Sequence, residues 1–73
     1  MKTLQFIQLN RQQRSDAIEK IVSIVAELDV EVFGARDRAT IIKAIEQDAN
    51  PDADFIFDEI DCDRVDVIYR ENI

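Results

Sequence analysis

The sequence predicts an α+β fold in the order β-α-α-β-β, with two helices packed on one face of a three-stranded antiparallel sheet. Two observations support this prediction. Apolar residues recur with the period of a helix along much of the chain before Pro51, and beyond Pro51 the period changes to two, which is typical of strands. A length of 73 residues is sufficient for a single small domain, residues 1–73.

The first strand and the first helix follow from local patterns. Residues 3–9 are rich in β-forming side chains that roughly alternate, so a strand is expected there. Asn10 offers a helix N-cap, with Gln13 three residues later as a capping-box partner. A helix over about residues 11–28 is then predicted by apolar residues at helical spacing, namely Ala17, Ile18, Ile21, Val22, Ile24, Val25 and Leu28.

The middle of the chain contains one ambiguous segment and a second helix. Residues 30–33 suit either a frayed helix end or a short extended segment. Gly34, the single glycine, is expected at a position with positive φ at a helix end. A second helix is predicted over about residues 36–48, and Pro51 ends it because proline disfavours helical geometry in the residue before it.

A C-terminal β-hairpin is predicted over residues 54–70 by alternation on two segments. Phe55 and Phe57 share one side with Val65, Val67 and Tyr69, which leaves Asp54, Ile56, Asp58, Asp66, Ile68 and Arg70 on the other side. The first strand would add Gln5 and Ile7 to this second side. The segment Asp61-Cys62-Asp63 provides the turn, since aspartate tolerates turn geometry.

Negative charge is concentrated in the last third of the chain. Residues 1–45 carry seven basic and six acidic side chains, a balance of +1, whereas residues 46–73 carry two basic and ten acidic ones, a balance of −8. Together they give the formal net charge of −7. Such localised charge indicates the kind of partner that the protein binds rather than its fold. It disfavours direct nucleic-acid binding, because carboxylates repel phosphates.

The residue types present disfavour most chemistry. There is no histidine, which excludes a His/Cys zinc site, and nearby negative charge from Asp61 and Asp63 disfavours a reactive thiolate at Cys62. A calcium loop starting at Asp52 fails the EF-hand register, because Phe57 stands where glycine is needed. We therefore expect no enzyme activity, no cofactor and no specific metal site, while weak divalent-cation binding stays open.

The stretch from Gly34 to Ile45 resembles the start of the second helix of ribbon-helix-helix regulators and antitoxins. It has glycine at the turn and the pattern A-x-I-x-x-A-I over residues 39–45. The resemblance implies a dimer whose N-terminal strand reads the major groove of DNA through Thr3, Gln5 and Ile7. It also implies an acidic, toxin-binding tail that begins near Asn50.

The leading functional prediction is a small, non-enzymatic, acidic binding protein. It would dock on a basic, nucleic-acid-binding protein and inhibit it by nucleic-acid mimicry, as small acidic inhibitors of phages and mobile elements act against host defence. The predicted partner-binding residues are Asp54, Ile56, Asp58, Glu59, Asp61, Asp63, Asp66 and Ile68. A ribbon-helix-helix antitoxin or regulator is the alternative, and the acidic stretch could also be only a solubility feature.

The sequence also bears on the cellular compartment, on membrane association and on the oligomeric state. A single cysteine is typical of a reducing compartment, so a cytoplasmic protein is expected. The chain has no apolar run of 18 residues, so no membrane partner is expected. A monomer and a homodimer both remain open.

Overall fold

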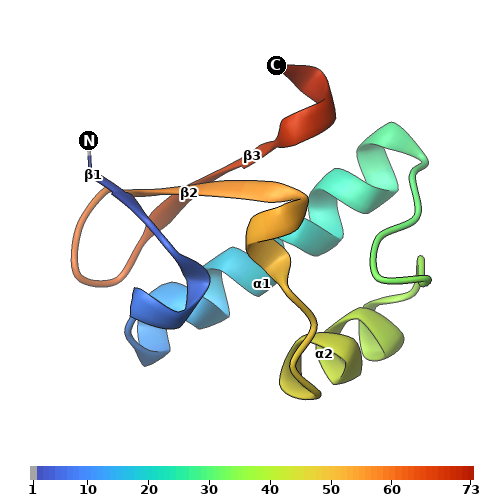
Figure 1. Cartoon of the computed structure of the whole chain (residues 1–73), viewed down its shortest axis with the longest axis horizontal. Helices are drawn as coiled ribbons and strands as arrows, with labels where there is room; N and C mark the ends of the chain where they lie inside the picture. Colours follow the sequence, from blue (N-terminus) through green and yellow to red (C-terminus); the bar gives the residue numbers. More distant parts are fainter. Residues whose placement is uncertain (1) are drawn as a thin grey trace.

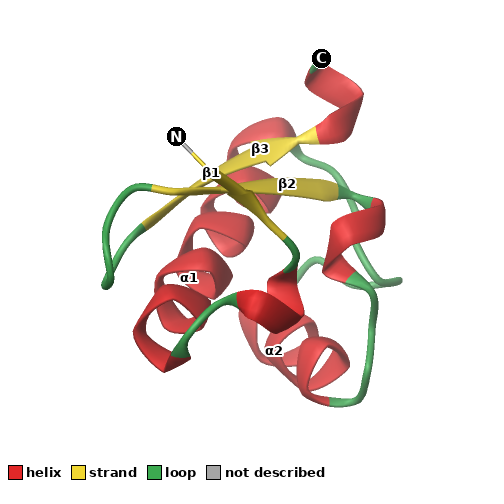
Figure 2. Cartoon of the chain, turned by 60° about the vertical axis from the view of Figure 1, so that its left-hand side comes forward, coloured by secondary structure: helices red, strands yellow, loops and turns green. Residues whose placement is uncertain are grey.

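The computed structural model describes residues 2–73 and shows the predicted order, β-α-α-β-β (Figure 1). The antiparallel sheet has the order β1-β2-β3, formed by β1 (Lys2–Leu4), β2 (Phe55–Glu59) and β3 (Val65–Tyr69). Helix α1 (Arg11–Leu28) lies against β3, and α2 (Arg38–Glu46) packs against α1 below the sheet (Figure 2). Three 3-10 turns complete the fold: η1 (Phe6–Gln8), η2 (Pro51–Ala53) and η3 (Arg70–Asn72). Within residues 2–73, no helix has the length and apolar character needed to cross a membrane.

Helix α1 begins at the predicted capping box. The Asn10 side chain accepts a hydrogen bond from the Gln13 backbone N–H at 2.9 Å, and the Gln13 side chain accepts one from the Asn10 N–H at 3.0 Å. The buried residues of the helix are Gln13, Ala17, Ile21 and Val25. Their four-residue spacing places one stripe of the helix against the core. The helix ends at Leu28, since Asp29 adopts the left-handed conformation with φ 51°.

The first strand is shorter than predicted. The sequence predicts a strand over residues 3–9, whereas only Lys2–Leu4 pairs with β2, and Phe6–Gln8 forms the turn η1. The Phe6 N–H donates to the Asp52 carboxylate at 2.8 Å instead of to a neighbouring strand, so the ladder stops there. Leu9 then enters the core, while Ile7 is 75% exposed and does not join the outer side of the sheet.

The segment between the helices forms a tight turn. Val32 and Ala35 make an isolated antiparallel bridge, with backbone hydrogen bonds of 3.0 and 2.8 Å. Phe33 and Gly34 lie between them with φ values of 53° and 73°. The positive φ expected of Gly34 is confirmed, but it serves this turn, and Asp29 occupies the left-handed position at the end of α1.

Helix α2 is two residues shorter at each end than the predicted range of 36–48. Asp37 caps its start, because the carboxylate accepts hydrogen bonds from the Thr40 hydroxyl at 2.7 Å and the Thr40 N–H at 2.9 Å. These bonds hold the pKa of the Asp37 carboxyl below its usual value of 3.8. Past the end of the helix, Asp48 adopts φ 69°, and Pro51 begins η2.

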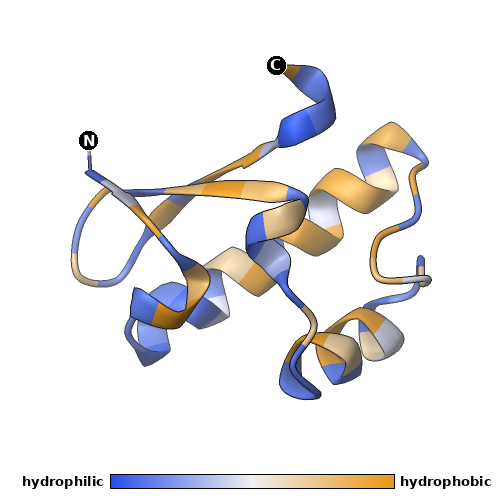
Figure 3. Ribbon diagram, in the orientation of Figure 1, coloured by the Kyte–Doolittle hydropathy of each residue, from blue (hydrophilic) through white to orange (hydrophobic). Residues whose placement is uncertain are grey.

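The predicted C-terminal hairpin is confirmed. The register pairs Phe55 with Tyr69 and Phe57 with Val67, and both phenylalanines are almost fully buried. The Phe55 ring lies 5.4 Å from the Tyr69 ring and the Phe57 ring lies 5.5 Å from that of Phe6, which are typical aromatic contact distances. Figure 3 shows apolar stretches along β2, β3 and the second half of α1. The hairpin is therefore an integral part of the core.

Candidate functional site

The side of the hairpin that faces away from α1 gathers four of the eight residues predicted to bind a partner, while Asp54 precedes β2 in a helical turn conformation that strand alternation does not place. Because Phe55 and Phe57 are buried against the helices, their neighbours in β2 face outward. The register sets Asp58 opposite Asp66 and Ile56 opposite Ile68 in successive rows, and Asp54 directly precedes β2. In the part of the chain that the structure describes, both long helices, α1 and α2, lie on the other side of the sheet (Figure 2). We refer to Ile56, Asp58, Asp66 and Ile68 as the acidic face.

The row formed by Asp58 and Asp66 brings two carboxylates together. Residues directly opposite each other in an antiparallel pair have Cα atoms about 4.5–5.5 Å apart. The Thr3 hydroxyl of β1 donates to Asp58 at 2.5 Å, but within residues 2–73 the Asp66 side chain forms no hydrogen bond or ion pair. Like charges directly opposite each other on adjacent strands repel, so this row is unfavourable within the sheet.

The row formed by Ile56 and Ile68 adds apolar surface beside these carboxylates. Both isoleucines are half-buried, and Ile60, which continues the alternation beyond β2, is 42% exposed. Sequence reasoning missed Ile60, although simple extension of the alternating pattern identifies it. A shallow depression of about 190 Å³ adjoins the row, and Ile56 and Arg70 are among the residues that line it. The face therefore combines apolar contact area with negative charge.

Glu59 lies on the opposite side of the sheet from the acidic face. The alternation of β2 turns it toward the helices with Phe55 and Phe57. Its carboxylate accepts a hydrogen bond at 2.9 Å from the side-chain amide of Gln13, which is only 2% exposed. The structure thus gives Glu59 a partner inside the protein.

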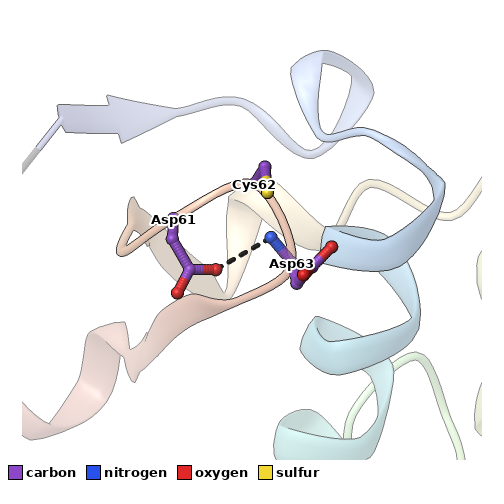
Figure 4. A group of neighbouring side chains, drawn as sticks. All are labelled: Asp61, Cys62 and Asp63. Carbon is purple, nitrogen blue, oxygen red and sulfur yellow. Dashed lines mark hydrogen bonds between the residues drawn. The ribbon is translucent and has the colours of Figure 1, made fainter.

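The hairpin turn places Asp61 and Asp63 beyond the end of β2. The Asp61 carboxylate accepts a hydrogen bond from the Asp63 N–H at 2.8 Å (Figure 4) and two from the Arg64 guanidinium at 2.9 and 3.0 Å. The N–H of Asp63, and then Arg64, hold the pKa of the Asp61 carboxyl below its usual value of 3.8. Arg64 therefore balances the charge of Asp61, and Asp63 remains exposed.

The same turn also brings together three potential metal ligands. One oxygen each from Asp61 and Asp63 and the sulfur of Cys62 lie within 4.8 Å of one another, all on exposed side chains. The hydrogen bonds of Asp61 already shape this turn, as Figure 4 shows for Asp63. Hard cations need more oxygen ligands than this group supplies.

Polar side chains at the start of α1 fix the position of the hairpin. The Asn10 amide donates to the Cys62 carbonyl at 2.7 Å, and the Gln13 amide donates to the Asp61 carbonyl at 2.8 Å. Further along the helix, Asp16 and Lys20 bind the backbone of β3. We refer to Asn10, Gln13, Asp16 and Lys20 as the polar row. Their spacing along one side of the helix is visible in the sequence, but their backbone partners are not.

Asp16 and Lys20 both bind Val65, the first residue of β3. The Asp16 carboxylate accepts a hydrogen bond from the Val65 N–H at 3.0 Å, and the Lys20 ammonium donates to the Val65 carbonyl. The two side chains also form an ion pair at 2.9 Å. Burial alone would raise the pKa of the Asp16 carboxyl, but the Val65 N–H and Lys20 outweigh burial and hold it below its usual value of 3.8.

Comparisons with known proteins give no further assignment. No protein-family model, curated protein sequence or solved structure matches this chain.

Proposed function

We propose that this chain is a non-enzymatic binding protein whose acidic face docks on a basic, nucleic-acid-binding protein and inhibits it. The observation that carries the proposal is the arrangement of rows on the uncovered side of the sheet. Asp58 and Asp66 lie directly opposite each other, next to the directly opposite Ile56 and Ile68. An apolar centre bordered by charge is the usual composition of a protein interface.

The cost of this arrangement also supports a function. Two like charges opposite each other on adjacent strands destabilise the sheet, and a row of that kind is unfavourable for folding. Solubility needs only charges of either sign spread over the surface, without two carboxylates in one cross-strand row. Departures from what favours stability tend to occur at functional sites. The Asp58–Asp66 row is such a departure.

The partner follows from the chemistry of the face. A basic surface that normally binds phosphates would be attracted to the carboxylates, which steer association, while the isoleucines hold the complex together. Occupying that surface would exclude the nucleic acid, so inhibition by mimicry is the proposed mechanism. A cytoplasmic inhibitor of the phage or mobile-element type, acting against host defence, fits this role. Direct binding of nucleic acid does not.

The ribbon-helix-helix alternative is less compatible with the arrangement of β1. In that family the N-terminal strand pairs with its copy in a dimer, whereas here Lys2–Leu4 pairs with β2 of the same chain. The Thr3 side chain is bound to Asp58, and Ile7 lies in the turn η1 instead of in a strand. A DNA-reading ribbon would require this pairing to be broken.

The test begins with affinity capture of a partner at low salt, followed by kinetic measurements with the purified partner. Changing both Asp58 and Asp66 to Asn should slow association about tenfold at low salt and flatten its dependence on ionic strength. The matched control changes Glu27 and Glu31, exposed residues away from the face, to Gln. Equal effects of the two double variants would reduce the acidic face to a solubility feature.

A further step separates mimicry from simple docking. The partner is titrated with a labelled DNA duplex in the presence and absence of the inhibitor. Mimicry predicts mutual exclusion of DNA and inhibitor. A stable ternary complex would contradict mimicry, because the acidic face would then occupy some other surface.

A further inference from the structure

A second surface lies in the helical layer, on the other side of the sheet from the acidic face. It is an open groove of about 590 Å³ between η1, α1 and the connection from α2 to η2. None of its lining residues belongs to a strand; they are Phe6, Ile7, Arg14, Ile18, Ile45, Glu46, Asp48, Ala49, Asn50, Pro51 and Asp52. Its volume is in the range of protein ligand sites, about 300–1,000 Å³.

The groove has an apolar floor and one strongly exposed apolar side chain. Phe6, Ile18 and Ile45 belong to the core or pack against it, and they contribute apolar surface to the groove. Ile7 is 75% exposed, far more than an isoleucine in a core-packed turn requires. It therefore offers a contact for an apolar group that lies in the groove.

Side chains from α1, η2 and η1 itself hold the turn that carries Ile7. The Arg14 guanidinium donates to the Ile7 carbonyl at 2.8 Å, and the Asp52 carboxylate accepts the Phe6 N–H at 2.8 Å. The Gln8 side chain accepts the Gln5 N–H at 2.8 Å. These three bonds fix η1 before anything binds. A site that is already ordered loses less conformational entropy on binding.

The rim of the groove is acidic. Glu46 and Asp48 are exposed, and within residues 2–73 neither forms a side-chain hydrogen bond or an ion pair. The single basic side chain, Arg14, is already occupied, since it binds the Ile7 carbonyl and lies 5.8 Å from the Phe6 ring centre. With Asp52, the rim carries three carboxylates against one guanidinium.

We infer that this groove binds a basic amphipathic segment of a partner protein. An apolar side chain of that segment would lie on the floor beside Ile7, and its lysines or arginines would pair with Glu46 and Asp48. A second copy of this chain is a poor occupant, because each copy carries a net charge of −7 and an acidic rim. This surface goes beyond the proposed function, which rests on the acidic face alone.

The probe is a synthetic peptide of about 14 residues with leucine at positions i, i+3, i+4 and i+7 and lysine elsewhere, a pattern that becomes amphipathic when the peptide is helical. Isotope-labelled full-length protein is titrated with it, and backbone amide shifts are followed by NMR. We expect the shifts to concentrate at η1, the start of η2 and the groove side of α1. A peptide with glutamine in place of lysine should bind about tenfold more weakly, since the rim charges then have no partner.

Two matched pairs of variants distinguish the groove from general attraction to an acidic protein. Ile7→Ser should weaken peptide binding at least about fivefold, whereas Ile73→Ser, at an isoleucine that is 79% exposed near the C-terminus, should not. Glu46→Lys should weaken it about tenfold, and Glu27→Lys, the same charge change at an exposed residue outside the groove, should have a much smaller effect.

Several results would overturn this inference. One is equal weakening within each matched pair, and another is a shift pattern centred on Ile56 and Asp58. Saturation of the groove by n-decylamine as tightly as by the peptide would indicate a small-molecule pocket. Concentration-dependent dimerisation that buries Ile7 would indicate that a second copy occupies it. The Asp58 and Asp66 double variant should bind the peptide normally, so failure of either proposal leaves the other testable.

Discussion

Within residues 2–73, four residues adopt a left-handed backbone conformation, and one of them is glycine: Asp29, Phe33, Gly34 and Asp48 have φ values of 51°, 53°, 73° and 69°. Aspartate visits this region at moderate cost, but a bulky residue such as Phe33 does so rarely. The Phe33 ring lies 6.4 Å from that of Phe55, and this packing offsets the strain. Only the glycine could be assigned a positive φ from the sequence, because residues with a Cβ atom adopt negative φ at most positions.

Gly34→Ala should lower the free energy of unfolding by about 1–2 kcal/mol, the cost of a left-handed conformation for a residue with a Cβ atom. Space is not the cause, because a Cβ at this position would meet no atom within 4 Å. Urea unfolding followed by circular dichroism measures the change. An unaltered midpoint would show that the Phe33–Gly34 turn is not maintained in solution.

Cys62→Ser should leave both stability and partner binding unchanged, within about 0.5 kcal/mol. The Cys62 side chain is exposed, and its only described hydrogen bond uses the backbone carbonyl, which serine retains. Thermal unfolding and the binding assay for the acidic face test this. A folded Cys62→Ser protein that no longer binds would give the thiol a role that the sequence argument denies it.

At the scale of elements, α1 is joined to the hairpin by the polar row as well as by the core. Gln13 is the buried member, and its amide binds both the Glu59 side chain and the Asp61 carbonyl. Gln13→Ala should lower the free energy of unfolding by about 2–3 kcal/mol, since it leaves a buried gap, deprives two partly buried oxygens of their donor and removes half of the capping box. The exposed neighbour Gln12 supplies the control, because Gln12→Ala should change stability by less than about 0.5 kcal/mol. Equal losses would contradict this role of Gln13.

The free energy of unfolding should decrease in acid, because carboxylates take part in the contacts between α1 and the hairpin. Asp16 and Asp61 have carboxyl pKa values that are lower in the folded protein than the usual 3.8. Such groups stabilise the fold above the pKa of the unfolded chain, and this stabilisation is lost as the pH falls through the lower, folded value. We expect nearly constant stability from neutral pH to about pH 5 and a decline below about pH 4.

Asp16→Asn tests the contribution of this one group. The variant should be less stable at neutral pH, where the charged carboxylate binds Lys20 and the Val65 N–H, and its stability should depend less on pH below about pH 4. Urea unfolding across the acidic range gives both quantities. An acid dependence identical to that of the unchanged protein would rule out a contribution from Asp16.

The order of elements could be predicted from the sequence because it depends on periodicity, which is local. The capping box at Asn10 and the hairpin after Pro51 were predicted for the same reason. The lengths of elements depend on distant residues. The first strand ends early because Asp52, about 46 positions away, takes the Phe6 N–H, and no local pattern indicates such a contact.

At the scale of the whole molecule, the net negative charge includes one cross-strand pair, Asp58 and Asp66, that lowers stability. Asp66→Lys changes the net charge from −7 to −5 and turns a repulsive cross-strand pair into an attractive one with Asp58. The variant should gain about 0.5 kcal/mol of stability, while partner binding should weaken. Glu27→Lys makes the same change in net charge, but it should change both the stability and the partner binding less than Asp66→Lys does. A variant that gains stability and keeps full binding would count against the acidic face.

The candidate site was predictable only in part. Alternation along β2 and β3 sufficed to place Ile56, Asp58, Asp66 and Ile68 on one side. It also turns Glu59 inward, and the hydrogen bond from Gln13 could not be foreseen because it joins segments distant in the sequence. The groove beside Ile7 was missed for a similar reason, since η1, α1 and η2 contribute to it separately.

The polar row has a consequence for contacts between separate molecules. A sheet of three strands leaves the outer edge of β3 open, and an exposed edge can pair with a strand from another chain. Asp16 and Lys20 already occupy the N–H and carbonyl of Val65, so an incoming strand would find that end of β3 taken. An incoming strand could therefore pair only with the other four residues of this five-residue strand. If the first turns of α1 frayed, Asp16 and Lys20 would release the backbone groups of Val65. Protection of this edge against β-sheet aggregation therefore depends on the first half of a helix.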